Sequence, residues 1–444
     1  MNPISREGQI TMRLELHNIR IKDVRFGADT KVDNGVLTIN RQELQALLEG
    51  DRRLSKVDIE IAHPGERCRI LQVGDVIEPR AKMGSAPGDI WGDAGSHSMI
   101  GEGKTCVLRG AAVVISDYRE TGRETISAEP HGAIIDMAGP GSEVSEFGKT
   151  QNIVLLPQPK SGVGVLDYQA ALKVAGLKTA AYLGKAGRDQ RPDETEIYDL
   201  PPITEIARGI EGLPKVTYIA QVISLQFEPV PGEPILFGQQ AGGILPTILH
   251  PNQVLDGAVT SPFPGLNVQT YHIQNHPIIK ELYHRHGKDL CFTGVIVTIA
   301  PNNVSDFERM ASIAASLAKW ILGADGAVLT KTAGGAPELA MARTAQKCEQ
   351  LGIRTAIAML HMGADVRDAK YGASTIFSMP EVDAIVSMGT PYTVLTLPPV
   401  ERVIGRTGFA PEAPSIAGEI VRPLSGIKGA LCQMGSSRLT AVRH

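Results

Sequence analysis

The feature that most constrains the fold of this chain is the regular alternation of short apolar runs with helical patterns after residue 214. The runs at 216–223 and 292–299 are predominantly apolar, which is typical of strands buried on both faces. Apolar spacing predicts helices over 305–322 and 338–351. Further short strands are predicted at 327–329, 355–358 and 384–386. Strands separated by helices in this order form a mainly parallel sheet, and ligands of such sheets bind at the carboxyl ends of the strands.

The first part of the chain follows a different pattern. Residues 12–21 alternate apolar and polar side chains, which predicts a strand with one face on a core. The Asp-Asn-Gly sequence at 33–35 predicts a tight turn before a strand at 36–39, and a short helix is expected at 41–49. A stretch rich in Gly, Ser, Asp and Pro at 84–103 predicts a long loop, either functional or disordered.

The segments that follow lead to a three-part organisation. A strand is expected at 152–156, a helix at 167–183 and a linker at 185–213. We therefore predict an α/β protein with a β-rich N-terminal domain (1–150), a helical segment and linker (151–213), and a Rossmann-like α/β substrate domain with a mainly parallel sheet (214–444).

Composition excludes several classes of protein. Lys plus Arg number 44 against 48 Asp plus Glu, and aromatic residues are only 5%, so neither the charge nor the stacking surface of a nucleic-acid-binding protein is expected. Five widely spaced cysteines predict neither a disulfide framework nor a zinc ribbon, which favours a reducing cytoplasm. No stretch approaches the roughly 20 apolar residues that span a bilayer, so no membrane association is expected.

Two motifs have both a functional and a structural interpretation. Lys331, Gly334 and Gly335 lie between a predicted strand and the next helix, where backbone amides could bind a carboxylate or phosphate, or form an ordinary βα turn. The run that begins at Leu255 is predicted to start as a strand and to break into a turn. Within it, Asp256 precedes small hydroxyl residues and could be a base beside the nucleophile Ser261, although no nucleophile elbow surrounds it and a plain loop is the alternative.

Four histidines gather within fifteen residues, at positions 272, 276, 284 and 286. Pro277 disfavours a helix that would place His272 and His276 on one face, and no metal-binding spacing is present. We therefore predict no metal site, and surface or structural histidines are the alternative to acid–base catalysts.

Several segments of the sequence resemble a known family, component B of the glycine, sarcosine and betaine reductases. They are similar specifically to the proprotein that supplies the α and β subunits of this component. The likeness spans residues 12 to 405. Its segments include Asp75-Val76-Ile77-Glu78-Pro79-Arg80, Val107-Leu108-Arg109-Gly110-Ala111-Ala112, Ile134-Ile135-Asp136-Met137-Ala138-Gly139, Asp256-Gly257-Ala258, Gln274-Asn275 and Arg285-His286-Gly287-Lys288-Asp289-Leu290.

The resemblance implies capture of a small amine for reductive cleavage of a C–N bond. In that family the chain cuts itself before a cysteine, which becomes a pyruvoyl group that forms a Schiff base with the substrate amine. A separate subunit that carries selenocysteine then attacks the substrate carbon. Thioredoxin-type reductants and a component that forms acetyl phosphate complete the cycle.

The sequence departs from the family pattern at the reactive loop. The family's cysteine should follow Asp256-Gly257-Ala258 closely, but residues 259–267 contain none, and the next cysteine is Cys291 in a predicted strand. A cysteine-derived pyruvoyl group is therefore not expected. Cleavage before Ser261 is conceivable, but it would leave the new acyl group on Pro262, so we expect an uncut chain and assign no cofactor.

We predict a component B-like subunit that binds a small amine or related carboxylate and takes part in reductive C–N or C–S cleavage. Its expected partner is a second subunit resembling the reductase selenoprotein. The alternatives are a redox-neutral lyase or hydrolase subunit, or a non-catalytic binding or scaffold subunit. The expected catalytic residues are Asp256, Thr260, Ser261, His272 and His286. The expected substrate-binding residues are Asn275, Lys331, Gly334 and Gly335.

Overall fold

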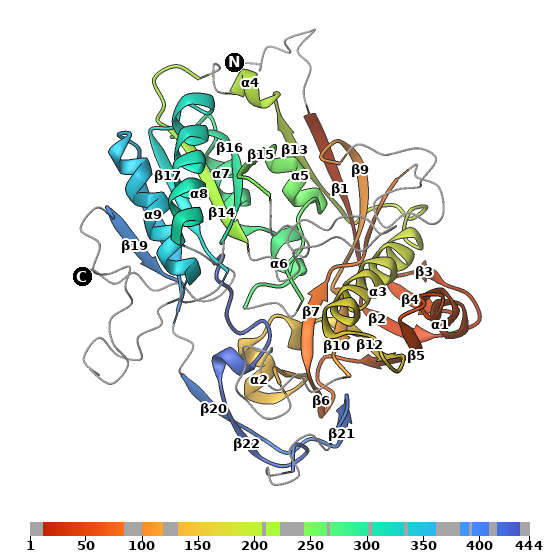
Figure 1. Cartoon of the computed structure of the whole chain (residues 1–444). Coiled ribbons are helices and arrows are strands. Elements are labelled where there is room, and N and C mark those ends of the chain that lie inside the picture. The colour runs from red at the N-terminus through yellow and green to blue at the C-terminus, as the bar shows by residue number, and fades with distance from the viewer. Residues whose placement is uncertain are drawn as a thin grey trace.

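The structure is a computed structural model with several sheets and helices packed on them (Figure 1). It describes residues 12–83, 100–118, 132–206, 210–222, 244–263, 267–300, 304–332, 336–360, 382–389, 393–407 and 415–435. The fold is mixed α/β, and many of its strands are parallel. In the described residues no helix is long and apolar enough to cross a membrane.

The largest sheet is six-stranded, in the order β15-β16-β14-β17-β18-β19. Its strands are β14 (Lys215–Val222), β15 (Thr247–Leu249), β16 (Cys291–Ile299), β17 (Gly326–Thr330), β18 (Arg354–Met359) and β19 (Ala384–Ser387). All pairs are parallel except that of β15 with β16. The mainly parallel sheet and the strands predicted from apolar runs are confirmed.

Helices cover both faces of this sheet. Side chains such as Ile219 and Ile296 pack against α8 (Val304–Ser316) and α9 (Ala336–Gln350). The alternate side chains, including Tyr218 and Val295, pack in a second core with α5 (Pro251–Asp256) and α7 (Pro277–Arg285). The helices α5 and α7, together with α6 (Thr270–Gln274), lie between the large sheet and the N-terminal strands (Figure 1). The helix predicted over 305–322 changes to a π-helical turn at Leu317–Ile321.

The N-terminal strands build two four-stranded sheets. One has the order β13-β1-β9-β8, from β1 (Met12–Arg20), β8 (Arg80–Lys82), β9 (Gly103–Arg109) and β13 (Glu194–Leu200). The other has the order β5-β12-β10-β7, from β5 (Leu54–Ala62), β7 (Val73–Ile77), β10 (Ala111–Ser116) and β12 (Gln151–Pro159). The stretch predicted as a linker thus contains a strand, β13, which pairs with β1 along its length.

Two helices pack on these sheets. The helix α3 (Val165–Lys185) is rich in Ala and Leu and is buried on nearly every side, packing on β7, β8 and β10. The predicted short helix is α1 (Arg41–Glu49), whose N-cap Asn40 accepts from the backbone of Glu43. The turn before it is also confirmed, since Asn34 and Gly35 have positive φ. A small sheet of β2 (Asp23–Phe26), β3 (Lys31–Asp33) and β4 (Val36–Ile39) lies beside α1.

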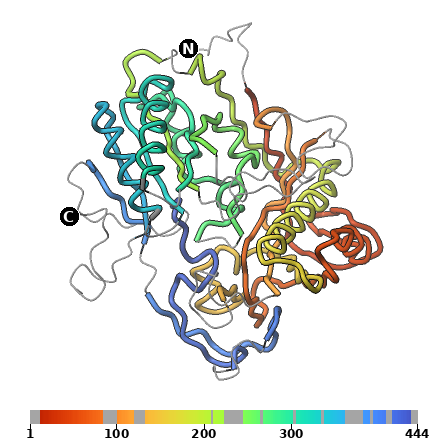
Figure 2. Tube along the Cα trace, viewed as in Figure 1, coloured from red at the N-terminus to blue at the C-terminus, as the bar shows by residue number. Residues whose placement is uncertain are grey.

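The end of the chain returns to the N-terminal strands. Strand β21 (Arg402–Ile404) pairs in parallel with β6 (Cys68–Ile70), which also pairs with β11 (Ile135–Asp136). Strands β20 (Val394–Leu397) and β22 (Ile420–Pro423) form an antiparallel pair beside α2 (Gly139–Val144) (Figure 2). The segment after β22 then runs back toward α6, so residues far apart in the sequence meet there.

One expectation about the reactive loop is wrong. Residues before Gly257 were expected to form a strand, but they form α5. Pro251 begins the helix, the His250 side chain accepts from the backbone of Asn252, and Gly257 ends it with φ of 107°. These are the capping and termination preferences of helices, which outweigh a short apolar run. Most of the loop predicted at 84–103 lies outside the described residues.

Candidate functional site

The order in which the chain adds strands to the sheet reverses at β14. From β14 the chain passes to β16 on one side, and it then returns to β17 on the other side. In parallel sheets a crevice opens at the carboxyl ends of the strands where the order reverses in this way, and ligands bind there. Because Ala220 is paired with Thr330, Gln221 and Lys331 follow at this edge.

A buried tyrosine joins the two central strands at this edge. The hydroxyl groups of Tyr218 and Thr330 are hydrogen-bonded, and the same tyrosine oxygen lies 3.0 Å from Nε2 of His276. Burial, and then the nearby His272, lower the pKa of His276 to about 3. The ring is therefore neutral at physiological pH. As expected from Pro277, α6 ends before His276 and a new helix begins after it.

Several buried polar atoms around this edge have no hydrogen-bond partner in the described part of the chain. They include His276 Nδ1, Gln221 Oε1, Thr332 Oγ1 and Gln269 Nε2. Each such atom costs about 1–3 kcal/mol when it is buried without a partner. Because native proteins pair most buried polar groups, several unpaired atoms at one sheet edge favour a ligand-binding site.

A buried ion pair lies at the same edge. Lys331 Nζ is 3.1 Å from Glu338 Oε1, and the two side chains are only 1% and 8% exposed. Gln433 Oε1 is 3.4 Å from the same nitrogen. Burial lowers the pKa of Lys331, and Glu338 opposes that change. A buried ammonium beside a buried carboxylate offers one group for each end of a zwitterion.

His272 is held by an acidic residue from another part of the chain. Its Nε2 is bonded to Glu146 Oε1, and its Nδ1 accepts the backbone N–H of Gln269 at 3.1 Å. Burial alone would lower the pKa of His272, but Cys432 and Glu146 outweigh burial and raise it to about 10.

Ser261 is part of a separate buried network. Its hydroxyl donates to the carbonyl of Val268 at 2.6 Å, and its backbone N–H donates to Thr270 Oγ1 at 3.2 Å. Thr270 in turn donates its N–H and hydroxyl to Asp75, at 2.9 and 2.7 Å. Asp75 is ion-paired with Lys173. Ser261, Val268 and Thr270, which lie in or next to the loop that matches the family's reactive loop, are therefore held by hydrogen bonds, and the neighbouring Thr260 is also buried.

Other predicted site residues lie in separate structural networks. Asp256 is ion-paired with Lys82 and accepts from Thr105 Oγ1 at 2.7 Å. The Nδ1 atom of His286 accepts the backbone N–H of Phe292 at 3.0 Å, which closes the turn after α7. Gly334 and Gly335 lie outside the described residues.

Asn275 belongs to a charged network that joins α6 to the N-terminal sheets. Its amide donates to Glu78 at 3.0 Å, and its oxygen accepts from Arg109. Arg109 also donates to Glu78 at 2.7 Å and to Glu196 at 2.5 Å. Burial raises the pKa of Glu78, but Arg109 and Arg80 outweigh it and lower the pKa below its usual value. This network orients α6, which carries His272.

Of the predicted residues, the structure therefore places His272 and Lys331 beside the carboxyl edge of the sheet. The sequence interpretation missed most of their neighbours, which are Glu146, Tyr218, His276, Thr330, Glu338, Cys432 and Gln433. No local motif marks these residues, since Glu146 and Cys432 come from segments far from α6. Within the described ranges no three His, Cys, Asp or Glu side chains converge as a metal site requires.

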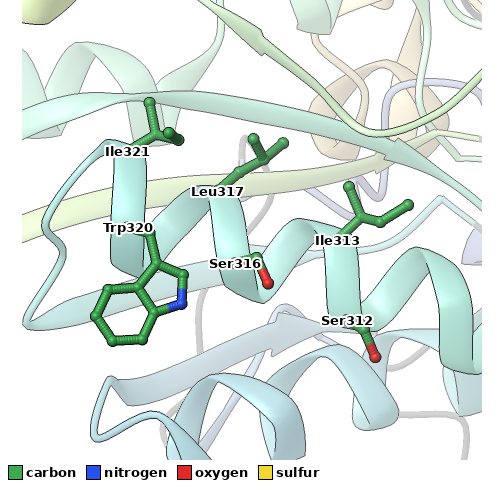
Figure 3. Close-up of a pocket in the computed structure, with 6 residues that line it drawn as sticks. All are labelled: Ser312, Ile313, Ser316, Leu317, Trp320 and Ile321. Carbon is green, nitrogen blue, oxygen red and sulfur yellow. The ribbon is translucent and has the colours of Figure 1, made fainter.

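A groove of about 340 Å³ lies elsewhere, on the outer surface of α8 (Figure 3). It is lined by Ser312, Ile313, Ser316, Leu317, Trp320 and Ile321. Trp320 and Ile321 are 70% and 58% exposed where the helix changes to a π-helical turn. No ionisable side chain lines this groove, so it lacks groups for acid–base catalysis.

The fold is that of an α/β protein whose parallel sheet has a buried polar edge, which is where enzymes of this class bind their ligands. Comparisons with known proteins identify its family. A family model described as glycine/sarcosine/betaine reductase component B subunits matches residues 12–430. The chain is 37% identical over 447 residues to the glycine reductase complex component B subunits alpha and beta of Acetoanaerobium sticklandii, covering 97% of this chain and 99% of that protein.

Two relatives from Peptoclostridium acidaminophilum are also similar. The sarcosine reductase complex component B subunit alpha is 34% identical over 432 residues, covering 96% of this chain and 94% of that protein. The betaine reductase complex component B subunit alpha is 32% identical over 400 residues, covering 89% and 88%. The chain belongs to the family of glycine/sarcosine/betaine reductase component B subunits and is a reductase-type enzyme subunit.

Proposed function

We propose that this subunit binds a small amino acid or related amine at the carboxyl edge of β14 and β17 and takes part in reductive cleavage of its C–N bond. The observation that carries the proposal is the buried Lys331–Glu338 pair beside polar atoms for which the described residues supply no partner. Glycine and sarcosine, which name relatives of this chain, each carry a carboxylate and an amine. Lys331 would bind the carboxylate and Glu338 the ammonium group.

The histidines would have different roles because their pKa values move in opposite directions. His272, whose pKa is raised to about 10, can take up a proton at neutral pH when its Nδ1 releases the backbone N–H of Gln269, and it can then give that proton to a departing amine. His276, whose pKa is lowered to about 3, stays neutral and offers a hydrogen bond without a competing charge. The electrons for reductive cleavage would come from a second subunit, since the name of the relative from Acetoanaerobium sticklandii places it in a reductase complex.

The loop at 257–268 does not fit a pyruvoyl group. It contains no cysteine, and the buried hydroxyl of Ser261 is engaged by the carbonyl of Val268 rather than by the preceding peptide bond. We therefore propose that this chain works uncut, without a pyruvoyl group in this loop, and that its own side chains bind the substrate. Such a group would otherwise supply an electron-withdrawing carbonyl for the substrate amine.

The experiment combines intact mass with ligand binding. The chain is purified with the product of its neighbouring gene, and mass spectrometry should detect one 47.4 kDa species. Calorimetry with glycine, sarcosine and betaine, and with acetate and methylamine as single-group probes, measures which end of the ligand is recognised. Lys331→Met should weaken carboxylate binding by about 2–3 kcal/mol, as expected for a charge-assisted hydrogen bond.

The matched control is Lys347→Met, since Lys347 is on α9 and makes a half-exposed pair with Glu308 at 3.5 Å. It should leave binding unchanged. Two fragments with a borohydride-reducible carbonyl would contradict the uncut mechanism. Equal binding by wild type and Lys331→Met would contradict the assigned site.

A further inference from the structure

Tyr218 connects three parts of the chain that meet at the carboxyl edge of the large sheet. It lies on β14, and its hydroxyl is hydrogen-bonded to Thr330 at the end of β17. The same oxygen lies 3.0 Å from Nε2 of His276, which lies between α6 and α7. The two rings pack edge to face, with centroids 4.9 Å apart. None of the three residues is more than 1% exposed, so their polar groups are shielded from bulk water.

The direction of these hydrogen bonds follows from the number of protons available. Burial lowers the pKa of His276 to about 3, so the ring is neutral at physiological pH and carries a single N–H. Thr330 and Tyr218 each carry one hydroxyl proton, and in the described part of the chain their hydroxyls bond only within this group. If Thr330 donates to Tyr218 and Tyr218 donates to Nε2, both hydroxyl protons are used. The ring then carries its own proton on Nδ1.

The opposite direction leaves more groups unsatisfied. If Nε2–H of His276 donated to Tyr218 and Tyr218 donated to Thr330, the hydroxyl proton of Thr330 would have no acceptor among the described residues. The Nδ1 lone pair would also lack a donor. If Thr330 and His276 both donated to Tyr218, the tyrosine proton would have no acceptor. Since every buried polar group without a partner is destabilising, the arrangement that leaves only Nδ1–H is favoured.

The Nδ1–H group of His276 is therefore a buried donor for which the described residues supply no acceptor. Lys331 follows Thr330 in the chain, and its Nζ lies 3.4 Å from Oε1 of Gln433. The backbone N–H of Gln433 donates in turn to the carbonyl of Asn267, just before α6, at 3.2 Å. These contacts bring Lys331 and the α6 segment to the same edge of the sheet. A carboxylate has two acceptor oxygens and can accept from an ammonium and from an imidazole N–H together.

We propose that Tyr218 and Thr330 are positioning residues that hold His276 protonated on Nδ1, and that this N–H donates to a carboxylate oxygen of the substrate. The ligand in this inference rests on the function proposed above, whereas the position of the proton does not. A neutral donor suits a site for an amino acid, because it adds a hydrogen bond to the carboxylate without repelling the ammonium group of the same molecule.

The first test measures the position of the proton in the full-length protein without a ligand. The histidine rings are labelled with a heavy nitrogen isotope, and nitrogen NMR distinguishes a ring nitrogen that carries a proton from one that does not. The signals of His276 are identified by their loss in His276→Gln. At neutral pH Nδ1 should carry the proton and Nε2 should not. A proton on Nε2 of wild type would overturn the proposal.

Three variants test the direction of the hydrogen bonds, with thermal unfolding as the check on folding. Tyr218→Phe removes the donor to Nε2, so part of the His276 population should become protonated on Nε2. Thr330→Val leaves the tyrosine proton for Nε2, so the tautomer should stay unchanged, and a change would overturn the proposal. The control is Tyr283→Phe, which removes the hydroxyl of another tyrosine of the same core, bonded to Asn252 instead of a histidine. It should leave the tautomer unchanged.

The second test measures which end of the ligand His276 contacts. Calorimetry gives the affinities for acetate, which presents only a carboxylate, and for methylamine, which presents only an amine. Acetate should bind about 3- to 10-fold more weakly to Tyr218→Phe than to wild type, the loss expected for one hydrogen bond. Methylamine should bind both proteins equally. Tyr283→Phe should bind both probes as wild type does.

The outcomes separate this inference from the proposed function. If wild type and Tyr218→Phe bind acetate equally, His276 does not contact the carboxylate, and the inference is overturned while the Lys331 site stands. If Tyr218→Phe weakens methylamine instead of acetate, His276 contacts the amine and the inference is again overturned. If wild type binds neither acetate nor glycine, the proposed function fails, and with it the ligand assigned to His276.

Discussion

Lys173 and Asp75 form an ion pair from which water is excluded, since neither side chain has any exposed surface. The pair joins the long helix α3 to β7, and Thr270 adds two hydrogen bonds to the carboxylate. Burial lowers the pKa of Lys173, and Asp75 opposes that change. The α6 segment is thereby attached to the N-terminal sheets through Asp75.

Replacing Lys173 with Met should therefore destabilise the protein strongly. The change leaves the buried Asp75 without its ion-pair partner, with Lys428 as a further cation nearby, and the expected loss is about 3–5 kcal/mol in the free energy of unfolding. Urea denaturation measures it. The control is Lys56→Met, whose pair with Asp58 is largely exposed and should change stability by at most about 1 kcal/mol. Restored stability in Lys173→Met with Asp75→Asn would confirm the cause, and a small loss in the single variant would contradict it.

His276 and His272 should make the stability of the protein depend on pH in opposite directions. The pKa of His276 falls from 6.5 to about 3 on folding, so its contribution is present above pH 6.5 and is lost as the pH falls toward 3. Wild-type stability should decrease there with a slope up to about 1.4 kcal/mol per pH unit from this group alone. His276→Gln should have a shallower slope in chemical denaturation. Identical slopes would mean that His276 is not buried as a neutral ring.

His272 should make the stability of the protein depend on pH in the alkaline range. Its pKa rises from 6.5 to about 10 on folding, so its stabilisation is fully present below pH 6.5 and is lost as the pH rises through 10. The difference in unfolding free energy between wild type and His272→Gln should shrink as the solution becomes alkaline. Cys432→Ser is a second test variant, because removal of the thiol should weaken the dependence of stability on alkaline pH. A difference that is constant with pH would contradict the assigned ion pairs.

Asp256 should prove structural. Its carboxylate pairs with Lys82 and accepts from Thr105 and from the backbone N–H of Gly101 at 2.7 Å. Asp256→Asn should lower the free energy of unfolding by about 3–5 kcal/mol, because Lys82 would keep a buried charge. Lys82→Met is the matched partner variant and should be similarly unstable. If Asp256→Asn abolished turnover with unfolding unchanged, the residue would instead act on substrate.

Close packing of α3 on β8 gives a test that involves no charge. A Cβ atom added at Gly184 would lie 2.4 Å from the backbone carbon of Arg80, and backbone cannot move aside as a flexible side chain does. Gly184→Ala should cost about 1–3 kcal/mol in thermal or urea unfolding. Gly164→Ala, at the other end of the helix, meets no atom closer than 3.6 Å and should be well tolerated. Equal stability of the two variants would contradict this packing.

Periodicity was sufficient to predict five of the six strands of the large sheet, all except β15. The runs at β14 and β16 are long and predominantly apolar, and such runs need burial on both faces. The α5 helix was missed because six residues hold too few turns to show a helical period. Strand β13 was missed because its residues are charged and alternate weakly, and its pairing with β1 supplies the stability.

The site could be predicted only in part, for a different reason. Lys331 follows a predicted strand, so its place at the carboxyl edge came from local sequence. Glu146 and Cys432 reach His272 from segments 126 residues before it and 160 residues after it, and no local pattern encodes a contact over such a separation. Asp256 and His286 were selected by their proximity in sequence, whereas their side chains bond to Lys82 and to the backbone of Phe292.

The return of the chain end to the centre of the molecule has a consequence for biosynthesis. Residues 428–433 supply Lys428 beside Asp75 and Lys173, Cys432 beside His272, and Gln433 beside Lys331. The polar centre therefore stays incomplete on a ribosome until residue 433 has been translated. A nascent chain that ends before residue 428 would leave the ion pair of Lys173 with Asp75 and the sheet edge without these side chains, so a chain truncated before that residue should not bind substrate at the sheet edge.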